Sequence, residues 1–129
     1  MSMRRLIEAA EVKNMRNADL EGADFSGANL QGATFEGANM ANCTLRDADL
    51  RSTQMDGVDL LYAGLEGAKM QGADLEGADL RGANLEVANF DGADFTRAKL
   101  GADFDGADFS KAKNLDKAKW PKGYKLVKG

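Results

Sequence analysis

The chain has 129 residues, a formal net charge of −4 at pH 7, 15 glycines, one proline and no histidine. So many glycines predict a backbone that turns often, which argues against a helix bundle. The absence of histidine from the sequence excludes Ser-His and Cys-His catalytic pairs and histidine-based metal sites. No apolar stretch approaches the ~18 residues that span a bilayer, so we expect no membrane insertion.

The charge is unevenly distributed along the chain. Residues 17–110 contain 18 Asp+Glu and 6 Lys+Arg, a net charge of −12, whereas residues 111–129 carry a net charge of +6. An acidic body of this kind is expected to repel nucleic acid and to prefer basic surfaces. We therefore expect a basic protein as partner and no direct binding of nucleic acid.

The first segment, residues 1–12, is predicted to form a short helical cap. Leu6, Ala9 and Ala10 fall on one side of such a helix, and the end of a repeat array needs a cap over its core. The segment lacks the apolar stretch of a secretory signal. Together with the single cysteine, Cys43, this predicts a cytoplasmic protein.

The next segment, residues 13–111, is a tandem repeat with a period of five. From Met15 to Leu100 every fifth residue is Leu, Met or Phe, here called the central residue. The residue two before it is small, the one before it is mostly Asp, Asn or Thr, and the one two after it is mostly Gly. A helix or a flat strand would scatter the central residues over different faces. A chain that turns once per unit keeps them all inside, and stacked coils can pair their backbones at ~4.8 Å.

The repeat resembles the pentapeptide-repeat family. The units at residues 73–77, 78–82 and 83–87 read Ala-Asp-Leu-Glu-Gly, Ala-Asp-Leu-Arg-Gly and Ala-Asn-Leu-Glu-Val, which matches the family pattern A(D/N)LXX. The resemblance implies an all-β fold, a right-handed quadrilateral β-helix with four units per coil and about five coils. It also implies that the central and small residues point inward, and it is strongest to stand-alone bacterial and cyanobacterial members.

The register of the repeat slips once. The step from Leu100 to Phe104 is four residues long and passes through Gly101, and the step from Phe109 to Leu115 is six residues long. The first step requires a tighter corner, which glycine allows, and the second restores the original phase. We interpret the slip as an architectural irregularity of the β-helix.

Regular coils are expected to end near residue 111, and residues 112–129 are predicted to form an irregular C-terminal cap. This segment contains Trp120, Pro121 and Tyr124, whose apolar surface can cover the last coil. The alternative is that the same apolar end joins two chains. The sequence therefore predicts either a monomer or an end-to-end homodimer.

Two acidic ladders are candidate interaction surfaces, because residues twenty apart share a face when a coil holds twenty residues. The aligned carboxylates are Glu36, Asp56 and Glu76, with Asp74 and Asp94 beside them, on one face, and Glu66, Glu86 and Asp105 on a second face. Like charges ~5 Å apart repel by about 1 kcal/mol in a water-like dielectric. The ladders are interpreted either as a solvated surface that keeps the rod soluble or as a surface that binds a basic protein.

A third candidate is the pair Leu61 and Tyr62, which lies outside the inward positions of the repeat. An exposed Leu-Tyr pair can anchor a partner, although single exposed apolar residues are also common. Cys43 occupies a small inward position and is expected to be a buried, unreactive thiol. No phosphate, dinucleotide or calcium-binding fingerprint occurs in the sequence, so we expect no cofactor, no metal and no catalytic residues.

These observations favour a non-enzymatic scaffold or protein-interaction module whose partner the sequence does not name. The alternative is a protein that imitates DNA and binds a type II topoisomerase such as gyrase, as some members of the resembled family do. The charge of −12 on the body favours the alternative. The short chain, the lack of inserted loops and the basic C-terminal segment argue against it.

Overall fold

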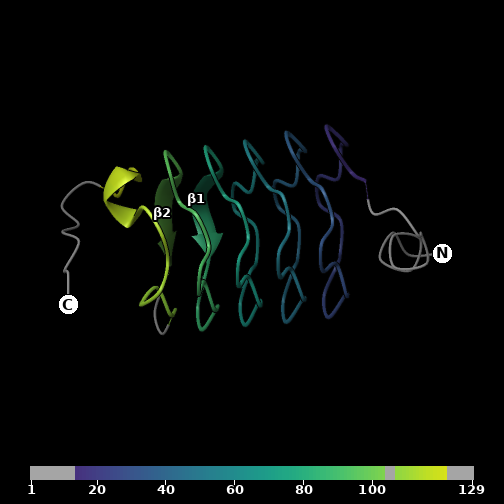
Figure 1. Ribbon diagram of the computed structural model, residues 1–129. Coiled ribbons are helices and arrows are strands. Elements are labelled where there is room, and N and C mark those ends of the chain that lie inside the picture. Colours follow the sequence, from purple (N-terminus) through teal and green to yellow (C-terminus); the bar gives the residue numbers. More distant parts are fainter. Residues whose placement is uncertain (1–13, 104–106, 122–129) are drawn as a thin grey trace.

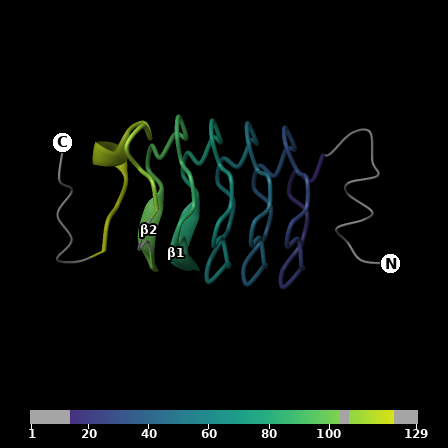
Figure 2. The same cartoon turned by 90° about the horizontal axis from the view of Figure 1, so that it is seen from below.

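The computed structural model describes residues 14–103 and 107–121. Short coils stack side by side along one axis, and the chain runs from one end of the stack to the other (Figure 1). A view turned by 90° shows the same single stack (Figure 2). The named elements are β1 (Asp79–Asn84), β2 (Lys99–Asp103) and a 3₁₀ helix, η1 (Leu115–Lys117). The described residues include no α-helix, and the predicted helical cap at residues 1–12 lies outside them.

Parallel bridges set the register of the stack. Most bridges join the residue before one central residue to its equivalent twenty residues later, as in Asn14↔Thr34 and Asp74↔Asp94. The pair β1 and β2 begins in this register, with Asp79 opposite Lys99, and shifts by one residue before Asn84, which lies opposite Asp103. The chain therefore advances by one coil every twenty residues through most of the repeat, and the fold is a parallel β-helix.

The hydrogen bonds of one unit explain its sequence pattern. The five successive N–H groups of residues 39–43 donate to Ala18 O at 2.9 Å, Asp59 O at 2.8 Å, Asn39 Oδ1 at 3.1 Å, Leu61 O at 2.8 Å and Met40 O at 3.2 Å. Four donors thus bind the backbone of the same or a neighbouring coil. The fifth binds the side chain of the residue before the centre, which is why Asp and Asn favour that position.

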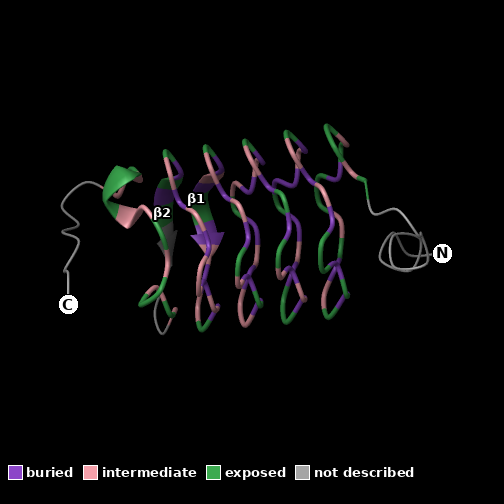
Figure 3. Ribbon diagram, in the orientation of Figure 1, coloured by how far each residue is buried: buried purple, intermediate pink, exposed green. Residues whose placement is uncertain are grey.

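Buried residues recur along the coils of the stack (Figure 3) and form the core. Every central residue from Leu20 to Leu100 is buried, and so is every small inward residue from Ala28 to Ala98. Two polar members bind the backbone: the Thr53 hydroxyl donates to Leu50 O at 2.8 Å, and the Cys43 thiol donates to a carbonyl oxygen at 3.0 Å. Burial raises the pKa of the Cys43 thiol to about 11, so this thiol stays protonated at neutral pH.

Each unit turns at the residue two after its centre, which has a positive φ in every unit from Asn17 to Arg97. Ten of these turn residues are glycine, the residue that adopts positive φ without steric cost. Val87 occupies the same conformation with a φ of 52°. A β-branched residue is strained in this conformation. The turn of unit 83–87 is therefore strained in a way that turns with glycine are not.

The register slip lies where the sequence predicts it. The bridges Asn89↔Asp108 and Asp94↔Lys113 join residues nineteen apart, whereas Lys99↔Lys119 again joins residues twenty apart. One residue is missing near Gly101, and η1 adds it back before Lys119. Bridging consequently continues to Lys119, beyond the end that was expected near residue 111, because η1 returns the chain to its original phase.

Trp120 closes the C-terminal end of the described core. Its backbone follows Lys119, whose carbonyl oxygen accepts a hydrogen bond from Leu100 N at 2.7 Å, so the indole continues the column that contains Leu100. The Trp120 ring meets Phe109 edge to face with centroids 6.0 Å apart, and its Nε1 donates to Leu115 O at 2.9 Å. This residue is half-buried and packs against the core.

Candidate interaction surfaces

The first predicted acidic ladder is a continuous column in the structure. Gly37 N donates to Asp56 O at 2.9 Å and Gly57 N donates to Glu76 O at 2.8 Å, which stacks Glu36, Asp56 and Glu76 on successive coils. The bridge Asp74↔Asp94 sets the neighbouring column in the same register. We call these five residues, Glu36, Asp56, Asp74, Glu76 and Asp94, the acidic face.

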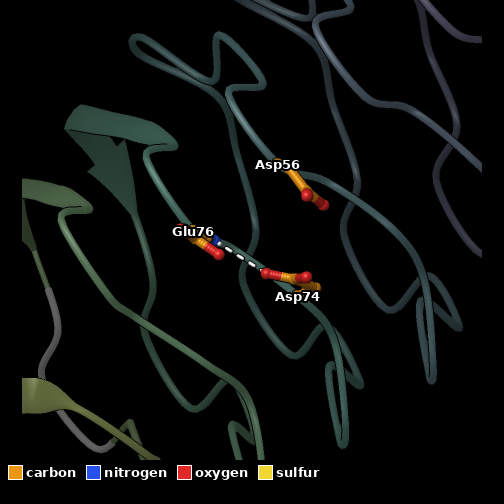
Figure 4. Close-up of side chains that lie close together, drawn as sticks. All are labelled: Asp56, Asp74 and Glu76. Atoms are coloured by element: carbon orange, nitrogen blue, oxygen red, sulfur yellow. Dashed lines mark hydrogen bonds between the residues drawn. The ribbon is translucent and has the colours of Figure 1, made fainter.

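Three carboxylates of the acidic face converge (Figure 4). One oxygen from each of Asp56, Asp74 and Glu76 lies within 4.8 Å of the other two. Asp74 Oδ1 accepts a hydrogen bond from Glu76 N at 3.0 Å, which fixes it at the edge of its turn. Asp56 Oδ1 is buried and accepts no hydrogen bond from the described residues, so part of the negative charge at this place is unsatisfied.

The pKa values of Asp74 and Asp94, two aspartates of the acidic face, shift in opposite directions. Desolvation raises the pKa of Asp74, and the nearby charges of Asp56 and Asp94 add to the shift. By contrast, a hydrogen bond from the Thr96 hydroxyl at 2.6 Å lowers the pKa of Asp94, and a second bond from Asn114 contributes. Of these two aspartates, Asp74 is therefore the one whose charge is less compensated.

Two arginines flank the ladder, a feature that the sequence analysis did not anticipate. Arg16 Nη2 lies 3.5 Å from Glu36 Oε1, and Arg97 Nη2 donates to Glu76 Oε1. Arg16 occupies the same column as Glu36, so the twenty-residue spacing in the sequence was enough to predict this pair. Arg97 belongs to the neighbouring turn position of the next coil, and only its side-chain direction reveals the pair. The flanking pairs leave Asp56 and Asp74 as the acidic centre of the face.

The second predicted ladder is shorter in the described residues. Gly67 N donates to Glu86 O at 3.0 Å, which stacks Glu66 and Glu86, whereas Asp105 lies outside the described residues. Arg46 Nε lies 3.7 Å from Glu66 Oε2, so this ladder also begins with an arginine. The other oxygen of Glu66 is buried and has no hydrogen-bond partner in the described part of the chain. We keep this second face as a separate candidate surface.

The corner at Leu61 and Tyr62 presents one aromatic side chain to solvent. Tyr62 is 68% exposed, whereas Leu61 is half-buried. An added Cβ on Gly82 would lie 2.4 Å from Tyr62 Cδ1, which shows that the ring rests on the backbone of the next coil where glycine leaves room. Tyr62 also turns the chain with a φ of 58°, so the same residue forms the corner and exposes the ring.

The acidic face presents carboxylate oxygens to solvent. Carboxylate oxygens are the ligands that Ca²⁺ and Mg²⁺ prefer, so Asp56, Asp74 and Glu76 would be the ligands if the acidic face took a divalent cation. Exposed acidic clusters are common without one, and Arg97 already neutralises Glu76. The sequence offers no histidine, and the one cysteine is buried and protonated. No helix among the described residues has the length and apolarity to cross a bilayer.

Comparison with known proteins agrees with this architecture. The family profile for pentapeptide repeats matches eight copies, over residues 14–40, 23–60, 62–97 and 88–119. A pentapeptide repeat protein from the thylakoid lumen of Arabidopsis thaliana is 31% identical with a TM-score of 0.62, over 76% of this chain and 66% of that chain. The pentapeptide repeat protein Rfr23 from the cyanobacterium Cyanothece 51142 is 29% identical with a TM-score of 0.52, over 68% and 64%.

Other comparisons add less. The plasmid-mediated fluoroquinolone resistance protein QnrB1 is 21% identical with a TM-score of 0.36, over 82% of this chain and 79% of that chain, and this likeness carries no argument about function. No curated protein sequence matches significantly. The chain spans just under two thirds of the length of the Arabidopsis and Cyanothece proteins.

The fold and its surfaces define a class of protein, a parallel β-helix whose outward side chains form columns one coil apart. Within that class, the chain belongs to the pentapeptide repeat family.

Proposed function

We propose that this chain is a non-enzymatic interaction module and that the acidic face binds a basic surface of a protein partner. The observation that carries the proposal is the convergence of Asp56, Asp74 and Glu76, whose oxygens lie within 4.8 Å of one another. The pKa of Asp74 is raised by its desolvation and by its acidic neighbours. A lysine or arginine from a partner would relieve that repulsion, and such complementarity favours both encounter and specificity.

The geometry of the face supports a particular kind of contact. Carboxylates on successive coils repeat at ~4.8 Å along the stack, so a partner with basic side chains along one strand or helix edge can meet several of them. Arg16 and Arg97 flank the column, and they would repel basic groups that overshoot its ends. The face thus favours a basic segment of limited length over any cationic surface.

We extend the proposal to the shape of the coils, the location of the protein and its oligomeric state. The bridges at twenty-residue intervals and the turn at every fifth residue support a four-sided coil, and we propose a right-handed winding and about five coils on the family resemblance. We also propose a cytoplasmic location, with the chain either a monomer or an end-to-end homodimer. Size-exclusion chromatography with light scattering separates the last two.

The test compares two variants of equal charge in a pull-down from the native host. The first variant carries Asp56→Asn, Asp74→Asn and Glu76→Gln, and the control carries Asp19→Asn, Glu21→Gln and Asp24→Asn on other columns. Both remove three charges, so net charge cannot explain a difference between them. We expect a basic protein to be retained by the wild type and the control and lost by the first variant, and retention should weaken with salt. Equal binding by both variants would contradict the proposal.

The alternative is a DNA-mimicking protein that binds a type II topoisomerase. The specific observation that favours it is the net charge of −12 on residues 17–110, arranged in columns rather than scattered. Gyrase supercoiling and drug-induced cleavage assays, with an Asp/Glu→Lys variant of the acidic face as control, test this function. No effect of the wild-type protein at micromolar concentration would eliminate it.

A further inference from the structure

An open pocket of about 500 Å³ lies at the C-terminal end of the stack. Its lining consists of Arg81, Lys99, Leu100, Gly101, Lys119, Trp120 and Pro121. Three of these residues are cationic, and no carboxylate is among the described residues that line it. On a body with a net charge of −12, this is a local reversal of sign.

The pocket exists because one column lacks a side chain. Gly101 occupies the position equivalent to Arg81 one coil earlier, and their backbones pair between β1 and β2. A Cβ on Gly101 would lie 3.5 Å from Arg81 Cγ, an ordinary contact, so glycine is not required there by steric crowding. Its φ is also not in the left-handed region. The missing side chain leaves a hollow between Arg81 and the cap formed by Trp120 and Pro121.

The cations of the pocket are held in place by the fold. Lys99 and Lys119 are bridge partners on neighbouring coils, which brings two ammonium-bearing side chains to one edge of the hollow. Arg81 forms a fork with Asp79, with Nε–Oδ1 at 2.9 Å and Nη2–Oδ2 at 2.6 Å. The fork fixes the guanidinium plane and uses only part of its five N–H donors. The charge of Asp79 also acts on Lys99 and that of Asp59 acts on Arg81, so two aspartates face three cations around this pocket.

The apolar part of the lining is separate from the cationic part. Leu100 is buried, and Trp120 and Pro121 are half-buried, so they offer a flat aromatic and aliphatic wall. Aromatic side chains bind flat rings by stacking, and lysine and arginine bind phosphate and carboxylate by charge-assisted hydrogen bonds. The two kinds of group stand side by side in one hollow.

We infer that this pocket binds a small organic anion, a flat ring that carries a phosphate or carboxylate group. The ring lies against Trp120 and Pro121, and the anionic group lies between Lys99 and Lys119. The pocket and the acidic face share no residue, so the two proposals are tested independently.

Trp120 is the only tryptophan of the chain, so its fluorescence reports on the pocket directly. Adenosine 5′-monophosphate is the probe with ring and anion, adenosine is the ring alone, and inorganic phosphate is the anion alone. We expect adenosine monophosphate to change the fluorescence in a saturable way and the other two to bind about tenfold more weakly or not at all. Calorimetric titration measures the same affinities without the fluorophore.

Matched variants separate the site from general charge. Lys99→Gln combined with Lys119→Gln should weaken binding of adenosine monophosphate by about tenfold or more, whereas Lys69→Gln, a lysine of another column, should leave it unchanged. Gly101→Leu should block the hollow, and Gly101→Ala should spare it. Circular dichroism melts check that each variant folds. Absence of saturable binding by both methods, equal affinity for adenosine, or wild-type affinity in the double lysine variant would each overturn the inference.

Discussion

At the scale of single residues, the turn of each unit combines two requirements. In many units the residue before the centre offers an oxygen to the N–H of the residue after the centre, as Asn84 Oδ1 does for Glu86 N at 3.0 Å. The residue two after the centre must adopt positive φ. Asp, Asn and Gly meet these needs at little cost. Departures from them, such as Val87, are places where stability can be gained.

Val87 and Gly27 occupy equivalent turn positions three coils apart, so they form a reciprocal pair for mutagenesis. Val87→Gly should raise the free energy of unfolding by about 0.5–1 kcal/mol, because relief of left-handed strain exceeds the added entropy of glycine in the unfolded chain. Gly27→Val should lower it by about 1 kcal/mol, since φ is 69° there and nothing within 4 Å of an added Cβ confuses the result.

Urea denaturation of the wild type and both variants measures these changes, and the slope with urea should stay constant. A decrease in stability for Val87→Gly would show that the exposed valine contributes packing that the conformational argument neglects.

The raised pKa of Asp74 predicts that its contribution to stability depends on pH with a sign opposite to that of Asp94. Its pKa is raised in the folded protein, so its charged form is less favourable folded than unfolded. Asp74→Asn keeps the Oδ1 that binds Glu76 N and removes the charge. The variant should therefore be more stable than the wild type at neutral pH, and the gain should shrink as the pH falls through the raised pKa and vanish below the ordinary value of 3.8.

The control for this experiment is Asp94→Asn. The pKa of Asp94 is lowered in the folded protein, so its charge stabilises the fold above the ordinary value of 3.8 and that stability is lost as the pH falls toward the lowered pKa. Asp94→Asn should thus destabilise the protein at neutral pH. Chemical denaturation across the acid range measures both variants, and a gain for Asp74→Asn that is independent of pH would refute the electrostatic explanation.

At the scale of elements, the twenty-residue ladder and its one irregularity follow from the spacing of central residues. The step from Leu100 to Phe104 predicts the nineteen-residue bridges, and the step from Phe109 to Leu115 predicts the return of phase that η1 provides. The end of the ladder was not predictable in the same way. Lysines stand where Asp or Asn is usual at residues 113 and 119, so the pattern fades before the backbone pairing does.

The candidate sites were predictable to a lesser degree than the fold. The columns of Glu36, Asp56 and Glu76 follow from the register alone, because a fixed period decides which residues share a face. The contact of Arg97 with Glu76 and the pocket at Gly101 depend on the directions of long side chains and on the cap. Those directions are settled by packing, which a repeat pattern does not encode.

The role of Trp120 at the C-terminal end of the stack can be tested by substitution. Trp120→Ala should lower the free energy of unfolding by about 2 kcal/mol through loss of buried aromatic area. The loss should be local, because neighbouring coils contact only one another. Hydrogen exchange should therefore accelerate most at Leu100 N, which donates to Lys119 O at 2.7 Å, and least at Leu30 N near the other end. Uniform acceleration along the chain would contradict a capping role.

At the scale of the whole molecule, the length of the coil determines which side chains lie together. A coil of twenty residues stacks the carboxylates of the acidic face, brings Lys99 beside Lys119, and places Trp120 in the column that contains Leu100. With a different coil length, the acidic residues that give residues 17–110 their net charge of −12 would not align. With a coil of twenty residues they form columns, with flanking arginines and a cationic hollow at one end.

The distance between spin labels at residues 16 and 96 tests this register most directly. These residues bound the acidic face, and the variant carries Arg16→Cys and Thr96→Cys together with Cys43→Ala, which removes the one native thiol. Eighty residues make four coils of twenty, so pulsed electron paramagnetic resonance should find one narrow distribution consistent with Cα atoms about 19 Å apart. A coil of fifteen residues would separate them by about 26 Å on different faces, and that distance, or a broad distribution, would contradict the account.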